Sequence, residues 1–227
     1  MNNAGAVTHP IWPLFDLRLQ TGELELRLPT EDDLVELIAV ARAGIHPPDE
    51  MPFAVPWTEL PSPEFERSAF QFHVGQRAGW KPEAWNLPLG VWDNGSPVGM
   101  QDIGARQFAA TRTVNTGSWL GLPFQGRGIG KRMRQAVLAL AFDHLGALGA
   151  ETEAMVTNPA SSRVSLGVGY RPNGHGVLSP RGSPIETDRY RMTLDDWRSR
   201  ERPLVEVSGL EPCLELFGVH STVESNL

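Results

Sequence analysis

The residue pattern with the clearest chemical meaning is a glycine-rich stretch ahead of a basic helix. Residues 125–131 read Gln-Gly-Arg-Gly-Ile-Gly-Lys and join an expected strand to an amphipathic helix. Glycines let the backbone turn tightly and aim several N–H groups at one anion, and the helix adds its positive dipole end. The stretch predicts a site for a polyanion such as a diphosphate, the alternative being a plain turn before a solvated basic helix. Between residues 123 and 134 there is no acid, and there are four positive charges: Arg127, Lys131, Arg132 and Arg134.

Two better-known phosphate-binding motifs fail on spacing in this stretch. A Walker loop needs Gly-x-x-x-x-Gly-Lys-Ser/Thr, but Gln125 stands in place of the first glycine and Arg132 in place of the hydroxyl. A Rossmann fingerprint needs Gly-x-Gly-x-x-Gly, whereas the glycines here fall at 126, 128 and 130, after several expected strands. The loop therefore matches neither motif.

The elements around this loop can be outlined from hydrophobic periodicity and turn signals. Thr30, followed three residues later by Asp33, predicts the start of a helix that Gly44 ends. Asn94-Gly95 predicts a hairpin turn. The pattern further predicts helices over residues 64–79, 129–148 and 160–166, strands over 23–28, 87–92, 98–105, 113–120 and 150–156, and a final strand over 186–193.

Composition narrows the class of protein. The chain has 227 residues, enough for one large domain or two small ones, and an ordinary apolar fraction of 41%. It contains no apolar window long enough to predict a membrane span and no basic-then-apolar start typical of a secretory signal. Cys213 is the only cysteine, which excludes an internal disulfide and a cysteine-based metal cluster and favours the cytoplasm. The net charge of −7 argues against a nucleic-acid partner.

Gln125-x-x-Gly128-x-Gly130 resembles the pyrophosphate loop of the GNAT superfamily of acyl-CoA N-acyltransferases, whose pattern is Gln/Arg-x-x-Gly-x-Gly/Ala. Residues 158–164, Asn-Pro-Ala-Ser-Ser-Arg-Val, and the later Gly169-Tyr170 resemble that family's Asn-x-x-Ser-x-x-Val and Gly-Tyr/Phe segments. The resemblance covers roughly residues 20–195. Within the family, the chain resembles the branch of ribosomal-protein-alanine acetyltransferases and most of all a mycobacterial succinyltransferase, through residues 12–18, 51–53, 55–58, 117–122 and 158–161.

This resemblance implies an α/β (α+β) GNAT fold, with a mixed, mostly antiparallel, splayed central sheet and helices on both faces. Residues 1–22 would lead into an acyltransferase domain at 23–202, and residues 203–227 would form a C-terminal extension. The pantetheine arm of the acyl-CoA would lie between two splayed strands and pair with backbone groups of Leu120 and Leu122. The diphosphate would be held by Gln125, Gly126, Arg127, Gly128, Ile129, Gly130 and Lys131.

Acyl transfer from a thioester to an amine needs a neutral amine, a polarised carbonyl and a proton for the departing thiolate. The resemblance implies that Asn158 hydrogen-bonds the pantetheine and that Ser161 gives the thiolate its proton; the alternative for both is helix capping. Asp102 and Glu153 are candidates for the base, with bulk water as the alternative, because an ordinary carboxylate needs desolvation to accept protons at neutral pH. No metal is expected, and Cys213 lies outside every motif.

The resemblance implies that the acceptor side lies in the proline-rich, aromatic loop at residues 46–63. The alternatives are that this loop shapes the pocket for a larger acyl group, or that its side chains simply cover the sheet or a subunit contact. Its aromatic and apolar candidates are Met51, Phe53 and Trp57, together with Trp80 and Trp85 further on. Acids at 49, 50 and 59 could attract a cationic amine.

The donor is expected to be acetyl-CoA, with succinyl-CoA as the close alternative. A succinyl tail ends in a carboxylate, which must find a cation or several donors when it leaves water. The candidate cations are Arg106, Arg112, Arg163 and Arg171.

The leading prediction is an N-acyltransferase that moves an acetyl group, or a succinyl group, from CoA to a primary amine by direct attack. The amine would belong to a small molecule, a protein N-terminus or a lysine, and the chain would form a homodimer or higher oligomer, with neither nucleic acid nor membrane as partner. One alternative is a non-catalytic acyl-CoA-binding sensor. Another is a structural partner that uses the apolar loop as an interface and has no affinity for CoA.

Overall fold

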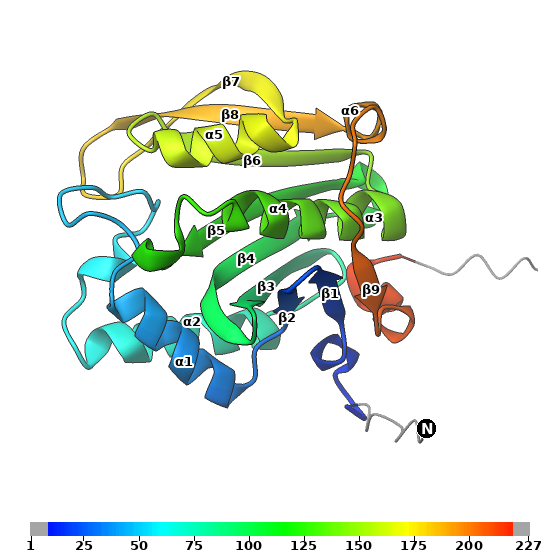
Figure 1. Ribbon diagram of the computed structural model, residues 1–227, viewed down its shortest axis with the longest axis horizontal. Helices are drawn as coiled ribbons and strands as arrows, with labels where there is room; N and C mark the ends of the chain where they lie inside the picture. The colour runs from blue at the N-terminus through cyan, green and yellow to red at the C-terminus, as the bar shows by residue number, and fades with distance from the viewer. Residues whose placement is uncertain (1–8, 220–227) are drawn as a thin grey trace, which may run out of the picture.

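The computed structural model describes residues 9–219, and its strands form one mixed sheet (Figure 1). The strands are β1 (Arg18–Thr21), β2 (Leu24–Arg27), β3 (Ala84–Asp93), β4 (Ser96–Arg106), β5 (Thr113–Leu120), β6 (Gly149–Met155), β7 (Arg171–Leu178), β8 (Ile185–Thr193) and β9 (Glu206–Ser208). The α-helices are α1 (Glu31–Arg42), α2 (Glu64–Ala78), α3 (Phe108–Thr111), α4 (Ile129–Ala139), α5 (Pro159–Val168) and α6 (Leu194–Arg198). Short 3-10 helices cover Pro13–Phe15, Trp57–Glu59, Leu122–Phe124 and Glu211–Phe217, and a π-helical turn covers Leu140–His144.

The strand order in the sheet is β7-β8-β6-β5-β4-β3-β2-β1-β9. Every neighbouring pair is antiparallel except β5 and β6, which run parallel. That parallel pairing joins only residues 113–115 to residues 149–151, and beyond it the two strands separate. A wedge therefore opens in the middle of the sheet, and the expected mixed, mostly antiparallel, splayed sheet is confirmed.

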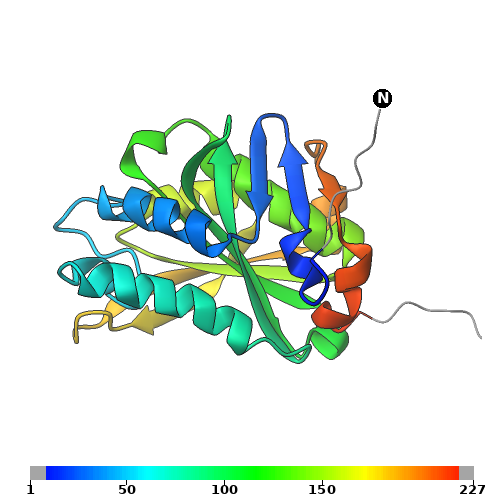
Figure 2. The ribbon, with the colours of Figure 1, turned by 90° about the horizontal axis from the view of Figure 1, so that it is seen from below.

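Helices cover both faces of the sheet, as expected (Figures 1 and 2). Successive strand residues point to opposite faces. Met100 of β4 packs with Leu37 of α1, whereas the next residue, Gln101, accepts a hydrogen bond from Arg134 of α4. It follows that α1 and α2, which pack together, cover one face and that α4 covers the other, with α5 beside it.

The start of α1 is the capping box that the sequence predicts. The Thr30 hydroxyl accepts the Asp33 N–H, and the Asp33 carboxylate accepts the Thr30 N–H at 2.8 Å. Burial opposes ionisation of Asp33, but the hydrogen bonds from Arg27 and Thr30 outweigh it and lower the Asp33 pKa to about 2. Gly44, with φ of 117°, follows the end of the helix.

We expect Asp33→Ala to lower the free energy of unfolding by about 1 to 2 kcal/mol at neutral pH, because the cap and the contact with Arg27 are both lost. The folded pKa lies below the unfolded value, so this contribution is full above about pH 4 and disappears as the pH falls through about 2. Urea melts at neutral and acidic pH test this, with the exposed Asp32→Ala of the same turn as control. Equal losses in the two variants would contradict it.

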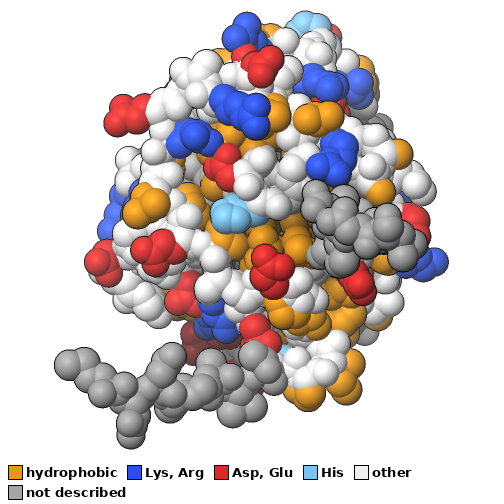
Figure 3. Space-filling view, turned by 90° about the vertical axis from the view of Figure 1, so that its right-hand side faces the viewer, with side chains coloured by type: hydrophobic (Ala, Val, Ile, Leu, Met, Phe, Trp, Pro, Cys, Tyr) orange, Lys and Arg blue, Asp and Glu red, His pale blue; other side chains and the backbone are white. Residues whose placement is uncertain are grey.

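The main core lies between the sheet and α4 and takes in both ends of the described chain. Leu17, Cys213 and Phe217 are fully buried in the same cluster as Val137 of α4. β9 pairs with β1 at the edge of the sheet. The segment expected as an extension thus supplies an edge strand and core side chains, and burial raises the pKa of the Cys213 thiol to about 12. Acidic and basic side chains are interspersed on the face over this edge (Figure 3).

Two sequence-based expectations about the elements are wrong, and two further strands were not predicted. The α-helix expected through residue 148 ends at Ala139 and is followed by a π-helical turn. The turn continues the apolar periodicity of the helix, so the sequence pattern does not distinguish the two. The strand at 186–193 is not the last, because the short β9 follows. β1 and β7 were not expected; β7 is exposed along most of its length and therefore lacks an alternating pattern. Within residues 9–219, no helix is long and apolar enough to cross a membrane.

Candidate active site

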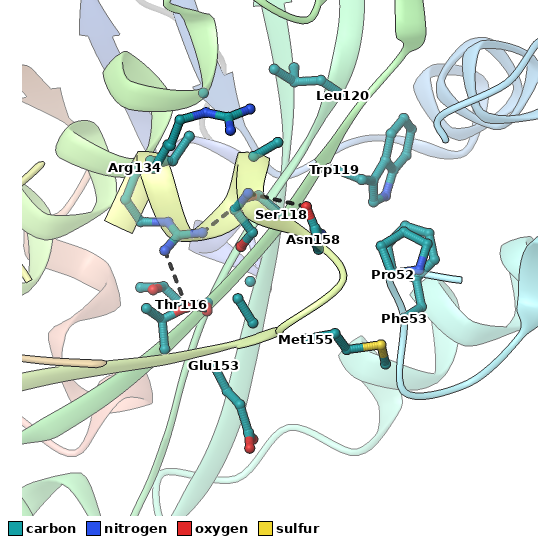
Figure 4. Close-up of a pocket in the computed structure, with 18 of the residues that line it drawn as sticks. Pro52, Phe53, Thr116, Ser118, Trp119, Leu120, Arg134, Glu153, Met155 and Asn158 are labelled. Atoms are coloured by element: carbon teal, nitrogen blue, oxygen red, sulfur yellow. Dashed lines mark hydrogen bonds between the residues drawn. The ribbon is translucent and has the colours of Figure 1, made fainter. Parts of the chain in front are cut away.

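The wedge between β5 and β6 holds a large hollow. Its volume is about 1290 Å³, and it is bordered by β5, β6, the first turns of α4 and α5, and the loop between α1 and α2 (Figure 4). Within the described residues, the β5 edge that faces β6 has no strand partner from Thr116 to Leu120. An unpaired strand edge can hydrogen-bond an extended ligand that carries amides.

The glycine-rich loop lies where β5 has diverged from β6 and leads into α4. Gly128 is the N-cap of α4 with φ of 80°, and Gly126 has φ of 72°, both in the left-handed region that glycine adopts freely. A Cβ at either position would meet no atom within 4 Å, and both residues line the cleft. An anion in the cleft can therefore approach the backbone N–H groups at the start of α4.

The four positive charges of this stretch do not form one free patch, which corrects the expectation of a local +4. Arg127 and Arg132 contact Asp93 of the β3–β4 hairpin at 3.9 and 3.4 Å. Arg134 is 3% exposed and lies beneath α4, against the sheet. Lys131 lines the cleft beside α5 and remains the cation placed to meet a phosphate. Charge counting missed the pairing because Asp93 is remote in sequence.

Gln125 ties the loop to the end of α1. Its side-chain amide donates to the Ile45 and Leu120 carbonyls at 2.8 and 2.9 Å. Leu122 lies outside the cleft lining, and its N–H already donates to the Gly44 carbonyl, so it does not offer the backbone group expected of it. Of the other expected ligands of CoA, the structure gathers Leu120, Gln125, Gly126, Gly128, Gly130, Lys131, Asn158 and Ser161 at the cleft, and it leaves Arg127 and the buried Ile129 outside the lining.

Asn158 and Ser161 form the α5 side of the cleft. The Asn158 Oδ1 atom accepts the Ser161 N–H at 3.1 Å, so Asn158 is the N-cap of α5. Among residues 9–219, the amide hydrogens of Asn158 and the hydroxyl of Ser161 have no hydrogen-bond partner. Capping and ligand binding are therefore compatible, because they use different atoms of Asn158.

Arg134 is a buried cation surrounded by neutral acceptors. Its guanidinium donates from Nε to Gln101 Oε1 at 3.3 Å, from Nη1 to Thr152 Oγ1 at 3.2 Å, and from Nη2 to Ser118 Oγ at 3.1 Å (Figure 4). Burial lowers its pKa. Within residues 9–219 it forms no salt bridge, and the charge of Asp102 acts on it only from beyond salt-bridge distance, so its burial is costly. The floor of the cleft therefore favours negative charge.

Asp102 is a carboxylate with a strongly altered pKa beside the cleft. Burial raises its pKa to about 7, against the opposing effects of a hydrogen bond from Asn86 and the charge of Arg134. It lies on β4 directly across from Gly117, which lines the cleft. The space beside Gly117 is open, because a Cβ at that position would meet no atom within 4 Å. A carboxylate with this pKa can accept a proton near neutral pH. Sequence reasoning named Asp102 but could not see its burial.

Glu153, the other candidate base, has its carboxylate engaged. It accepts hydrogen bonds from Thr187 and from Arg189, the latter at 3.3 Å. Its side chain points away from Arg134 in the cleft (Figure 4). Elsewhere too, within residues 9–219, no three His, Cys, Asp or Glu side chains gather as a metal site.

The acceptor side of the cleft is formed by the loop between α1 and α2. Phe53 and Trp119 border it (Figure 4), and Glu50 also lines the cleft. Trp57 stacks on Phe65 with ring centroids 5.5 Å apart, so it covers the α1–α2 face instead. Trp80 and Trp85 do not lie on the acceptor side, contrary to the expectation. They stack on each other against Phe217 in the main core.

Of the arginines expected near an acyl carboxylate, only Arg163 lines the cleft. Arg112 donates to the Gly146 carbonyl, and Arg171 pairs with Asp196, both away from the wedge. Arg106 borders a second hollow, under α2. Two other arginines, Arg134 and Arg189, line the cleft, and the sequence analysis did not name them as candidates for this role.

Comparisons with known proteins agree with this fold. A family model described as an acetyltransferase (GNAT) domain matches residues 23–171. RimL, a ribosomal L7/L12 alpha-N-protein acetyltransferase solved in complex with coenzyme A, is similar in fold with a TM-score of 0.62 and 17% identity, over 78% of this chain and 97% of that one. A spermidine N-acetyltransferase chimera from Vibrio cholerae gives 0.60 and 16%, over 79% and 100% of the two chains. A ribosomal-protein-alanine acetyltransferase from Vibrio fischeri gives 0.58 and 16%, over 79% and 98%.

Proposed function

The chain belongs to the GNAT acetyltransferase family, and from that premise we propose that it moves an acetyl group from acetyl-CoA to a primary amine by direct attack. One observation carries the proposal: the wedge between β5 and β6 opens onto the start of α4, where Gly126 and Gly128 leave room for an anion. An extended thioester arm fits the strand edge, and its diphosphate fits the helix start and Lys131.

Asp102 is the proposed base. The amine nitrogen attacks the thioester carbon, the carbon–sulfur bond breaks, and the proton lost by the nitrogen passes to the Asp102 carboxylate, directly or through water at Gly117. The raised pKa supports this role because a base is most effective when its pKa lies near the working pH.

Asn158 and Ser161 are proposed to serve the leaving group. The free amide hydrogens of Asn158 can bind a pantetheine carbonyl, and the Ser161 hydroxyl can give its proton to the thiolate and recover one from solvent. Their position on the first turn of α5 supports this, because the helix dipole there favours negative charge.

We expect Ser161→Ala to lower kcat by about 100-fold while CoA affinity changes little, because the contact strengthens only as charge develops on sulfur. Steady-state rates and CoA titrations measure the two effects. The matched control is Ser162→Ala, since Ser162 is the neighbour on α5 and lies outside the cleft lining. Wild-type turnover in Ser161→Ala would mean that Ser161 only packs.

The donor with a carboxylated acyl group, such as succinyl-CoA, is the alternative to acetyl-CoA. The cleft arginine Arg163 favours it, because it could meet the terminal carboxylate, whereas Arg189 already pairs with Glu153 at 3.3 Å. Melting temperatures with acetyl-CoA, succinyl-CoA and CoA at equal concentrations discriminate between the donors, since the ligand that binds best raises the melting temperature most. We expect acetyl-CoA to stabilise at least as well as succinyl-CoA; a clearly larger shift with succinyl-CoA would reverse the assignment of the donor.

The acceptor is proposed to be a primary amine on a small molecule, a protein N-terminus or a lysine, which is cationic in solution and loses one proton to solvent before it attacks. Glu50 at the mouth supplies negative charge, and Phe53 and Trp119 offer apolar surface for the rest of the molecule. Assembly as a homodimer or higher oligomer and a cytoplasmic location remain predictions from the sequence.

A further inference from the structure

Ser118 and Arg134 form a hydrogen-bonded pair at the floor of the cleft. Ser118 lies on the splayed part of β5, and its exposed side chain faces the wedge. Arg134 reaches it from the second turn of α4, with Nη2 at 3.1 Å from the Ser118 Oγ atom. The two residues come from different walls of the same cleft, and the steps assigned to Asp102, Asn158 and Ser161 leave both without a role.

The direction of this hydrogen bond fixes what the serine can do. A guanidinium only donates, so the Ser118 oxygen is the acceptor and its own hydrogen remains to be donated. Among residues 9–219, no acceptor takes that hydrogen. A hydroxyl that accepts a hydrogen bond from a cation is itself a stronger donor, because bonds in a chain polarise one another. Ser118 therefore presents a polarised O–H group to whatever occupies the wedge.

The guanidinium is held in place from three sides. Gln101, which accepts from Nε, is itself fixed because its amide donates to the Gly117 carbonyl at 2.8 Å. Thr152, which accepts from Nη1, donates its own hydrogen to the Thr116 carbonyl at 2.9 Å. These contacts span β4, β5 and β6, so the guanidinium bridges the strands where they separate. Such a preorganised charge costs little rearrangement when negative charge forms nearby.

We propose that the Ser118 hydroxyl donates a hydrogen bond to the thioester oxygen as negative charge develops there, and that Arg134 is the positioning residue that polarises and orients it. The inference rests on the proposed acyl transfer. No bond to Ser118 forms and no proton leaves it; it stabilises the oxygen while the amine attacks and relaxes when the sulfur departs. Ser118 on β5 and Ser161 on α5 line opposite sides of the wedge, so one hydroxyl serves the oxygen and the other the sulfur.

Ser118→Ala is the first test. We expect kcat to fall by about 100-fold, the usual order for removal of one such donor, while the affinity for CoA, which has no carbonyl at this point, stays the same. Ser118→Thr restores a hydroxyl at the same atom and should recover most of the rate. Ser162→Ala is again the control. Wild-type turnover in Ser118→Ala, or an equal loss of affinity for CoA and acetyl-CoA, would overturn the proposal.

A spectroscopic test needs no amine acceptor. Acetyl-CoA labelled with ¹³C at the thioester carbonyl is bound to the protein, and the carbonyl stretch is read by isotope-edited infrared difference. We expect the stretch to shift below its value in solution in the wild-type protein and in Ser118→Thr, and to return toward the solution value in Ser118→Ala. An unshifted stretch in the wild-type protein would overturn the proposal, whatever the kinetics show.

The role of Arg134 is tested through its dependence on Ser118. Arg134→Lys keeps a charge but loses the planar fork, with the exposed Arg198→Lys as control. We expect Arg134→Lys to lower kcat in the wild-type background and to have little further effect in Ser118→Ala, because a positioning residue acts through its partner. Independent, additive losses would overturn this part, and the Ser118 variants still decide the rest if Arg134→Lys fails to fold. Failure of the wild-type protein to transfer acyl groups to any amine would instead contradict the proposed function.

Discussion

Gly128→Val is expected to abolish acyl-CoA binding and to leave the fold intact. The new side chain would fill the open space at the start of α4, where Gly128 has φ of 80° and nothing lies within 4 Å of a Cβ. It would also disfavour the left-handed backbone that aims the loop's N–H groups at a phosphate. Losing two charge-assisted hydrogen bonds costs about 3 kcal/mol or more, which corresponds to at least about 100-fold in affinity. Titration calorimetry with CoA measures this directly.

Gly22→Val is the matched control for that variant. Gly22 has φ of 57°, also has nothing within 4 Å of a Cβ, and lies in the turn between β1 and β2. The two substitutions should therefore carry a similar backbone strain of about 1 to 2 kcal/mol. We expect similar melting temperatures and a loss of CoA affinity only in Gly128→Val. Unchanged affinity in a folded Gly128→Val protein would remove the diphosphate from this loop.

Asp102→Asn is expected to lower kcat by on the order of 100- to 10,000-fold, because it removes the proposed base without changing its shape. In the wild-type protein the rate should rise with pH through about 7, as the Asp102 carboxyl loses its proton. That limb of the pH profile should be absent in the variant. A variant that keeps the wild-type rate and profile would assign the amine proton to water or to another group.

Stability distinguishes this catalytic effect from damage to the fold. The folded pKa of Asp102 lies above the unfolded value, so the folded state loses stability relative to the unfolded state as the pH rises from about 4 to about 7. Asp102→Asn carries no such cost, and above neutral pH it should be at least as stable as the wild-type protein. Asp195→Asn, on the exposed side of α6, is the control for both rate and stability.

Local signals in the sequence were enough for several elements that position the site. The Thr30–Asp33 box, the Asn94-Gly95 turn and the loop glycines each act through a backbone conformation that their residue types dictate. The sequence also predicted β5, whose bounds match the expectation at 113–120. These features could be read because each depends on neighbours in sequence.

The chemistry of the site depends on contacts between remote segments, and the sequence alone could not supply them. The raised pKa of Asp102 comes from burial, and the pairing of Arg127 with Asp93 comes from a hairpin brought next to the loop. Arg134 left a usable signal: it stands three residues before Val137, one turn away on the apolar face of α4, and a basic residue on that face indicates a buried cation. β7 gave no signal, because a strand exposed on both faces has no alternation to detect.

Amine-dependent release of free thiol from acetyl-CoA is the measurement that tests the central claim most directly. A panel of small primary amines, polyamines and peptides with free N-termini would be offered to the wild-type protein and to Gly128→Val, with mass spectrometry of the amine to confirm its acetylation. We predict thiol release that requires both the protein and at least one class of amine and that disappears in Gly128→Val. The amine should gain one acetyl group for each thiol released. Tight binding of acetyl-CoA with no amine-dependent thiol release across the panel would contradict the account and leave an acyl-CoA-binding sensor in its place.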